Sequence, residues 1–90
     1  MTAGPYAIEF TSSAEKELDA LPRKGQARVL RAIIALADDP RPQGCRKLTG
    51  RDDAYRIRVG VYRVVYVIED DKLVVLVVRV GHRKEVYRRK

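Results

Sequence analysis

The sequence predicts an α+β fold in which one strand and two helices precede three further strands. Three observations support this order. Apolar residues alternate over residues 5–10, recur every three or four positions over residues 12–37, and alternate again from residue 54 onward. With 90 residues, of which 46% are hydrophobic, the chain is expected to form a single domain spanning residues 1–90.

The first strand is expected at residues 5–10. Its alternating positions are Tyr6, Ile8 and Phe10. Three hydroxyl residues follow at 11–13, and each is of a type that caps a helix N-terminus. The helix after them has one apolar face, made of Ala14, Leu18 and Leu21. Pro22 then ends this helix or begins the next one.

A second helix is expected from Pro22 to Ala37. Its apolar stripe has helical spacing and consists of Leu30, Ile33, Ile34 and Ala37. The helix should stop at Asp38-Asp39-Pro40, because the residue before a proline avoids the α region. The short link at Pro22 predicts an antiparallel helical hairpin. Residues 40–50 are expected to form an ordered loop.

Three more strands are expected beyond Ala54, joined by short turns as an antiparallel meander. Their order predicts β-α-α-β-β-β, with both helices on one face of a single twisted sheet and the other face partly open. The last strand, Leu73 to Val80, is almost wholly apolar, as expected of a strand covered on both faces. Gly81 to Lys90 is expected to leave the sheet as a short helix or turn.

The positive charge is concentrated in the second half of the chain. The net charge is +7. Residues 1–45 contain six Lys or Arg and six Asp or Glu, whereas residues 46–90 contain thirteen and six. An arginine-rich excess of this kind is typical of nucleic-acid-binding proteins, although it also occurs on surfaces that only confer solubility.

The period-two pattern places arginines on one face of the sheet. Tyr and aliphatic residues at 55, 57, 59, 62, 64, 66 and 68 should face the helices. Arg56, Arg58 and Arg63 then share the opposite face, where only Glu69 offsets them. Guanidinium groups gathered in this way favour a polyanion as ligand, although a solvated polar face is the simpler alternative.

A second candidate cluster follows the last strand and includes the only histidine of the chain. It consists of His82, Arg83, Lys84, Tyr87 and Arg88. No metal site or cofactor is expected, because the acidic pairs at 38–39, 52–53 and 70–71 are typical of turns and there is no glycine-rich phosphate loop.

These residue types suit metal-free cleavage of RNA. The 2′-hydroxyl would attack the adjacent phosphorus, and fixed arginines would stabilise the negative charge that develops on the phosphorane oxygens. His82 or Tyr87 would transfer protons. DNA should resist such an enzyme, because it has no 2′-hydroxyl.

Several segments resemble the RelE branch of the RelE/ParE toxin superfamily. They are residues 54–59 (AYRIRV), 62–66 (YRVVY), 80–87 (VGHRKEVY), Ile8-Glu-Phe, the helix around Leu18, and Lys47-Leu48-Thr-Gly50. The resemblance spans nearly the whole chain. It implies a fold similar to microbial RNases and cleavage of mRNA in the ribosomal A site. It also implies a cognate antitoxin that binds the toxin in a hetero-oligomer.

The resemblance also implies roles for single residues. The family's basic site positions fall on Arg56, Arg58, Arg63 and Arg83, and its C-terminal tyrosine falls on Tyr87. The best-known RelE toxins carry lysine at the positions of Arg56 and Arg58. Arginine stays protonated, so a role in phosphate binding survives this exchange but a role as general base does not. Proton transfer is then expected from His82, from Tyr87 or from the ribosome itself. Further basic residues expected to bind RNA are Arg46, Lys47, Arg51, Lys84 and Arg88.

Two alternatives to an RNA-cleaving enzyme stay open. One is a ParE-like toxin that inhibits DNA gyrase without catalysis, and the other is an inactive homologue that only binds an antitoxin. The single Cys45 excludes an intrachain disulfide, and no apolar run approaches the ~18 residues of a membrane span. The first ten residues do not resemble a signal peptide, so a cytoplasmic location is expected.

Overall fold

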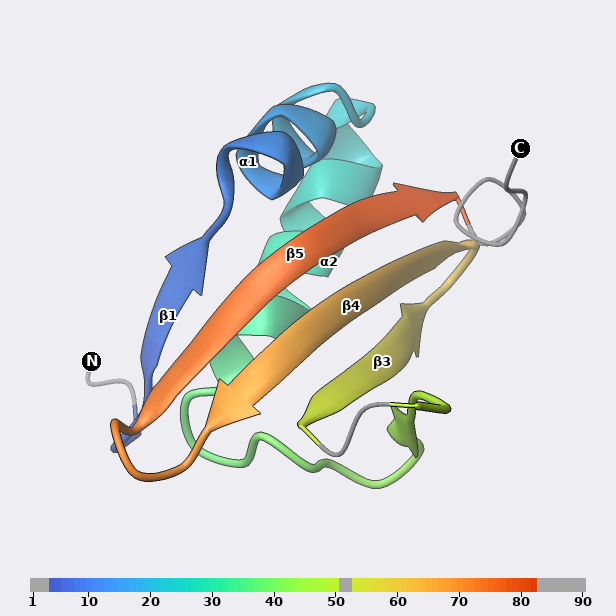
Figure 1. The fold of residues 1–90 in the computed structure, drawn as a ribbon. Coiled ribbons are helices and arrows are strands. Elements are labelled where there is room, and N and C mark those ends of the chain that lie inside the picture. Colours follow the sequence, from blue (N-terminus) through green and yellow to red (C-terminus); the bar gives the residue numbers. More distant parts are fainter. Residues whose placement is uncertain (1–3, 51–52, 83–90) are drawn as a thin grey trace.

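A computed structural model describes residues 4–50 and 53–82 of the chain (Figure 1). Its elements in chain order are β1 (Ala7–Phe10), α1 (Ser12–Asp19), α2 (Arg23–Ala35), β2 (Arg46–Lys47), β3 (Ala54–Val59), β4 (Tyr62–Glu69) and β5 (Val74–His82). The five strands form one sheet in the order β1-β5-β4-β3-β2. The predicted α+β order and the antiparallel meander β3-β4-β5 are thereby confirmed.

The first strand makes the sheet mixed, because β1 pairs in parallel with β5. Between them the chain leaves β1 through α1, whose N-cap is Thr11. The Thr11 hydroxyl accepts a hydrogen bond from the Ala14 amide at 3.1 Å. Pro22 is the N-cap of α2, so both helices begin where the sequence indicated.

The two helices and one face of the sheet enclose the core. In Figure 1, α2 lies behind β5 and β4, and α1 lies at the upper end of the sheet. The side chains buried between these layers come from both helices and from β3, β4 and β5: Ala14, Leu18, Val29, Ile33, Leu36, Ile57, Val64, Tyr66, Ile68, Val75, Val77 and Val80.

The buried side of α2 differs from the predicted stripe. Ile33 and Ala37 are fully buried as expected, but Leu30 is 38% exposed and Ile34 is 50% exposed. The helix is rotated so that Gly25 faces the sheet, where a Cβ atom would lie 2.6 Å from the Tyr62 ring. Because glycine allows this close approach, the buried face follows the line of Gly25, Val29 and Ile33 instead.

A segment predicted to be loop contributes a short strand. Arg46 and Lys47 pair with Arg56 and Tyr55 in antiparallel register, which extends the sheet by one short edge strand, β2. The pattern could not reveal this strand, because a two-residue strand has no measurable period.

The last strand contains a β-bulge between its two halves. Tyr66 pairs with Val77, but Val65 pairs with Arg79, so Val78 is an extra residue in β5. Val75, Val77 and Val80 face the core, whereas Val74, Leu76 and Val78 are half-buried. The face of this strand toward the helices is therefore fully covered, whereas the described residues cover its other face only in part. Gly81 and His82 continue the strand rather than leave it.

Candidate nucleic-acid interface

The register of the sheet brings arginines from four strands onto one face. Residues directly opposite each other on neighbouring strands point to the same side of a sheet. One row across the sheet consists of Arg58, Arg63 and Gly81, and the next row on the same face consists of Arg46, Arg56, Val65 and Arg79. We call the surface that carries these five arginines the arginine face. It is the face opposite the helices.

The arginines of this face differ in exposure. Arg46 and Arg58 are exposed and Arg56 is half-buried, whereas only 2% of Arg63 is accessible. Arg63 belongs to β4, which lies between the two long strands β3 and β5, whereas β3 has only the two-residue strand β2 on its outer side. The prediction that Arg63 shares a face with Arg56 and Arg58 agrees with the register, but its expected openness to solvent does not.

A hollow of about 310 Å³ lies at the β2–β3 edge of the arginine face. Its described lining residues are Gly44, Arg46, Arg56 and Arg58. Gly44 adopts φ +95°, a left-handed conformation that favours glycine, and it forms part of the turn that leads into β2. The hollow thus combines guanidinium groups from two strands with an exposed turn, an arrangement suited to binding an anion such as phosphate.

Not every predicted site residue joins this face. Lys47 pairs with Tyr55 and therefore points to the opposite side from Arg46. His82 pairs with Tyr62, and the two rings meet edge to face with centroids 6.2 Å apart. Because Tyr62 packs against Gly25 of α2, His82 lies on the helix side of the sheet rather than beside the arginines. Arg51, Arg83, Lys84, Tyr87 and Arg88 lie outside the described residues.

Arg79 belongs to the arginine face and was not among the predicted site residues. Simple alternation along β5 would place residue 79 on the same side as Val75 and Val77, facing the core. The extra residue Val78 reverses the alternation, so that Val80 faces the core and Arg79 faces outward. The sequence carries no clear signal for this change, because residues 73–78 are all apolar; the spacing of the buried valines, two from Val75 to Val77 and three from Val77 to Val80, is seen only in the structure.

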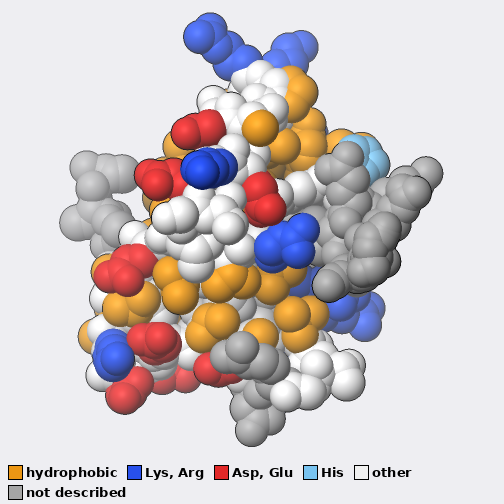
Figure 2. Space-filling model, turned by 45° about the horizontal axis from the view of Figure 1, so that its top comes forward, with side chains coloured by type: hydrophobic (Ala, Val, Ile, Leu, Met, Phe, Trp, Pro, Cys, Tyr) orange, Lys and Arg blue, Asp and Glu red, His pale blue; other side chains and the backbone are white. Residues whose placement is uncertain are grey.

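Charge is separated along the same face. Glu69 shares the face with the arginines but lies at its other end, about 13 Å from the row of Arg56 by strand rise. Glu9 lies on the same face on the edge strand β1, about 7 Å from that row by strand rise. Half-buried aliphatic side chains lie between the two ends. Figure 2 shows this arrangement as a band of hydrophobic side chains with basic side chains at one end and acidic side chains at the other. A polyanion would therefore be attracted to one end of the face only.

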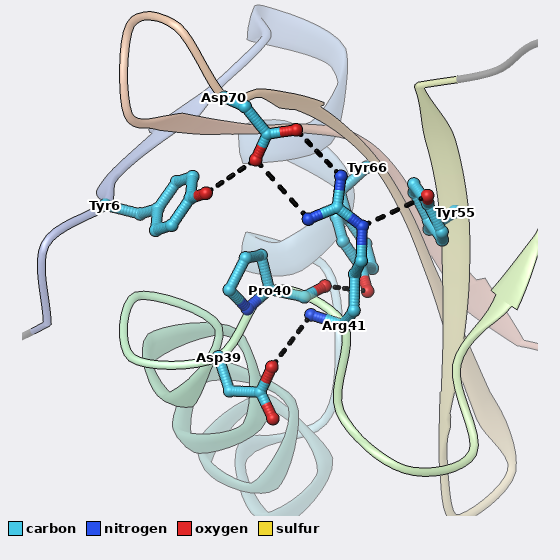
Figure 3. A network of polar contacts seen from close by, with 7 residues as sticks. All are labelled: Tyr6, Asp39, Pro40, Arg41, Tyr55, Tyr66 and Asp70. Atoms are coloured by element: carbon cyan, nitrogen blue, oxygen red, sulfur yellow. Dashed lines mark hydrogen bonds and ion pairs between the residues drawn. The ribbon is translucent and has the colours of Figure 1, made fainter.

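A polar network fixes the loop that leads to the hollow (Figure 3). The Arg41 guanidinium pairs with Asp70 at 2.8 Å and donates through Nε to the Tyr55 hydroxyl at 3.1 Å. The Tyr6 hydroxyl donates to Asp70 at 2.6 Å. The Arg41 and Tyr6 donors hold the pKa of the Asp70 carboxyl below its ordinary value. Arg41, next to Pro40, is thus tied to β3 through Tyr55 and to the β4–β5 turn through Asp70, which also binds Tyr6 just before β1.

The buried member of this network is Tyr66. Its hydroxyl donates to the Pro40 carbonyl at 2.7 Å, and its ring stacks on Tyr55 at a centroid distance of 6.1 Å. Burial raises the pKa of the Tyr66 phenol, so the hydroxyl stays protonated and remains a donor across the physiological range.

Replacing Tyr66 by phenylalanine is expected to destabilise the protein by about 1–3 kcal/mol, because the buried Pro40 carbonyl would lose its donor. Urea unfolding followed by circular dichroism measures this change. Tyr55→Phe is the matched control, since it also deletes one phenolic hydroxyl but at a half-buried position where water can replace it. Equal losses of stability in the two variants would contradict the assigned role of the Tyr66 hydroxyl.

The chemistry of the arginine face is binding and charge stabilisation. Guanidinium groups donate several hydrogen bonds in a planar array and stay protonated, so they neutralise phosphate but do not accept a proton near neutral pH.

Among the described residues, no group of three or more His, Cys, Asp or Glu is arranged to hold a metal ion. No helix in the described part of the chain is long and apolar enough to cross a membrane.

Comparisons with known proteins point to one family. Residues 8–87 match the family model described as ParE toxin of the type II toxin–antitoxin system parDE. The toxin RelG of Mycobacterium tuberculosis is 36% identical, with 94% of this chain and 99% of RelG covered. The mRNA interferase toxin RelE of Escherichia coli is 34% identical over 91% of this chain and 90% of RelE.

A solved structure is similar over nearly the whole length of this chain. It is the crystal structure of the toxin–antitoxin complex RelBE2 from M. tuberculosis. One chain of that complex superposes with a TM-score of 0.77 at 30% identity, covering 91% of this chain and 95% of the other. The similarity therefore extends over the whole fold, including the sheet that carries the arginine face.

Proposed function

Because the chain belongs to the RelE/ParE family of type II toxin–antitoxin toxins, in its RelE branch, we propose that it is an endoribonuclease that cleaves mRNA at the ribosome. The observation that carries this proposal is the arginine face, where Arg46, Arg56 and Arg58 line one hollow. The name of the E. coli relative, mRNA interferase toxin RelE, supports the same reading. Cleavage of mRNA would halt translation.

The proposed reaction needs no group beyond RNA and protein. The 2′-oxygen forms a bond to the adjacent phosphorus, and the bond from phosphorus to the 5′-oxygen breaks. The proton of the 2′-hydroxyl passes to a base, and the departing 5′-oxygen receives a proton from an acid. The products are a 2′,3′-cyclic phosphate and a 5′-hydroxyl. Arg56 and Arg58 would stabilise the charge on the phosphorane oxygens, which is greatest in the transition state.

Proton transfer is the part of the mechanism that the arginines do not supply. His82 lies on the helix side of the sheet, away from Arg56 and Arg58. We therefore assign proton transfer to Tyr87 or to a group of the ribosome in place of His82. The assignment of Tyr87, like that of Arg83, rests on the sequence alone.

The experiment that tests the proposal is cleavage of a defined mRNA on programmed ribosomes, read by primer extension. We expect a cut within the A-site codon and a 2′,3′-cyclic phosphate at the new end. An mRNA with a single 2′-deoxynucleotide before the scissile phosphate serves as the matched control, and it should stay intact at that position. Equal cleavage of both mRNAs would overturn the proposed attack by the 2′-hydroxyl.

A second candidate function is inhibition of DNA gyrase, which the ParE description of the matching family model favours. A supercoiling assay with purified gyrase distinguishes the two candidates. Gyrase inhibition together with uncut mRNA would support a ParE-like toxin. Absence of both activities, with growth unaffected by expression, would support an inactive homologue that only binds an antitoxin.

We also propose that an antitoxin binds this chain in a hetero-oligomer. The similar structure from M. tuberculosis is itself a toxin–antitoxin complex. Leu30 and Ile34 lie one turn apart on α2 and are exposed, and half-buried aliphatic side chains line the sheet face opposite α2. Such surfaces suit the apolar side chains of a partner that covers both faces.

A further inference from the structure

The row of residues across the sheet that contains Arg56 continues to β5, where it ends at Arg79. Arg46, Arg56, Val65 and Arg79 are successive partners on β2, β3, β4 and β5. Neighbouring strands are about 4.8 Å apart, so the backbone positions of Arg46 and Arg79 are separated by about 14 Å. The row is long enough for its arginines to contact more than one phosphate of an RNA strand.

The bulge at Val78 is what gives Arg79 this position. It places a charged residue on the outer face in the middle of a strand that is otherwise apolar, and it keeps Val80 in the core at 2% exposure. Bulges commonly redirect a side chain in this way near functional sites.

Glu17 on α1 holds Arg79 at the edge of the sheet. Beyond Val77, β1 no longer pairs with β5, and the Val80 amide donates instead to Glu17 Oε1 at 2.7 Å. The other carboxylate oxygen, Oε2, lies 3.3 Å from Arg79 Nε. This contact uses the Nε side of the guanidinium, and within the described ranges Arg79 makes no other ion pair. The Arg79 side chain is 43% exposed.

We propose that Arg79 is a phosphate-binding residue of this interface, so that an RNA strand lies across the sheet from Arg46 on β2 to Arg79 on β5. This inference rests on the proposed function, because it names RNA as the polyanion. It adds a binding residue on β5, which β4 separates from the strands that line the hollow. Glu69 lies at the other end of the face and would repel phosphates there, so the RNA strand is expected to run along the row of Arg56 rather than parallel to the β-strands.

The test is the salt dependence of binding to an octauridylate with 2′-O-methyl groups, which the protein cannot cleave. Removing one arginine–phosphate contact should reduce the slope of log affinity against log salt by about 0.7. For Arg79→Gln we expect this reduction and a loss of affinity of about fivefold at ~0.1 M salt, the size of an exposed ion pair. Arg79→Lys, which keeps the charge, should retain most of the slope.

Arg31→Gln is the matched control, since Arg31 is exposed on α2, on the other side of the sheet. It removes the same charge and should leave the slope unchanged. Equal effects of Arg79→Gln and Arg31→Gln would overturn the proposal. If Arg56→Gln reduces the slope and Arg79→Gln does not, the role of Arg79 is wrong while the proposed function stands. If neither variant reduces it, both proposals fail.

A measurement on the unaltered protein avoids any effect of substitution on folding. Phenylglyoxal modifies accessible guanidinium groups, and mass spectrometry locates the modified residues. We expect the octauridylate to protect Arg46 and Arg79 from modification and to leave Arg31 reactive. Full reactivity of Arg79 in the presence of saturating RNA would contradict the proposal.

Discussion

Substituting glutamine for Arg56 or Arg58 is expected to lower the rate of mRNA cleavage on ribosomes by about 10²- to 10³-fold. This is the usual effect of removing one preorganised donor that stabilises a transition-state charge. Both side chains line the same hollow, together with Arg46. Single-turnover cleavage of a programmed ribosome, followed by primer extension, measures the rate. Because the lost interactions form chiefly in the transition state, we expect the rate at saturating protein to fall more than the affinity for ribosomes.

Arg31→Gln is again the control for loss of one positive charge, and we expect its rate to stay within about twofold of the unaltered protein. Arg56→Lys should recover part of the activity, because lysine retains the charge but not the planar array of donors. Cleavage at the unaltered rate by both glutamine variants would show that the hollow is not the site of reaction.

Truncation of Ile33 to alanine is expected to have the largest effect on stability among the changes considered, about 2–5 kcal/mol. Ile33 is fully buried in the core between α2 and the sheet, and the surrounding side chains cannot close the cavity that its loss creates. Urea unfolding gives the free energy directly, and the urea dependence of that free energy should stay constant if the transition remains two-state.

Ile34→Ala provides a sharp comparison, because it deletes the same atoms from the next residue of the same helix. Ile34 is 50% exposed, so we expect a change within about 0.5 kcal/mol. The sequence pattern alone places both isoleucines on one apolar stripe and predicts similar costs. Comparable destabilisation by the two variants would mean that α2 presents a different side to the sheet.

The behaviour of α2 shows where sequence reasoning reaches its limit. Helical spacing identified the helix and its approximate ends. Leu30, Ile33, Ile34 and Ala37 were nevertheless grouped on one stripe, although Leu30 and Ile34 are exposed. Rotation about the helix axis is decided by the fit of Gly25 against Tyr62, two residues that are far apart in sequence and of which neither is strongly apolar. No local pattern carries that information.

The candidate site, like α2, could be predicted from the sequence only in part. Alternation along β3 and β4 was enough to place Arg56, Arg58 and Arg63 on one face, and the register agrees. Alternation failed for β5, because the extra residue Val78 changes the side to which Arg79 and His82 point. A bulge is specified by pairing with the neighbouring strand, and an apolar strand such as residues 74–80 shows almost no alternation from which to detect it.

The sequence by itself determined the order of elements, the basic character of the second half and the shared face of Arg56, Arg58 and Arg63. These features follow from periods of 2.0 and 3.6 residues and from composition, which are local properties. Only the tertiary structure decided that β1 pairs with β5, that Arg46 and Arg79 extend the arginine face, and that His82 lies on the other side. These depend on register, on the bulge and on packing between distant residues, and so they are fixed only when the strands meet.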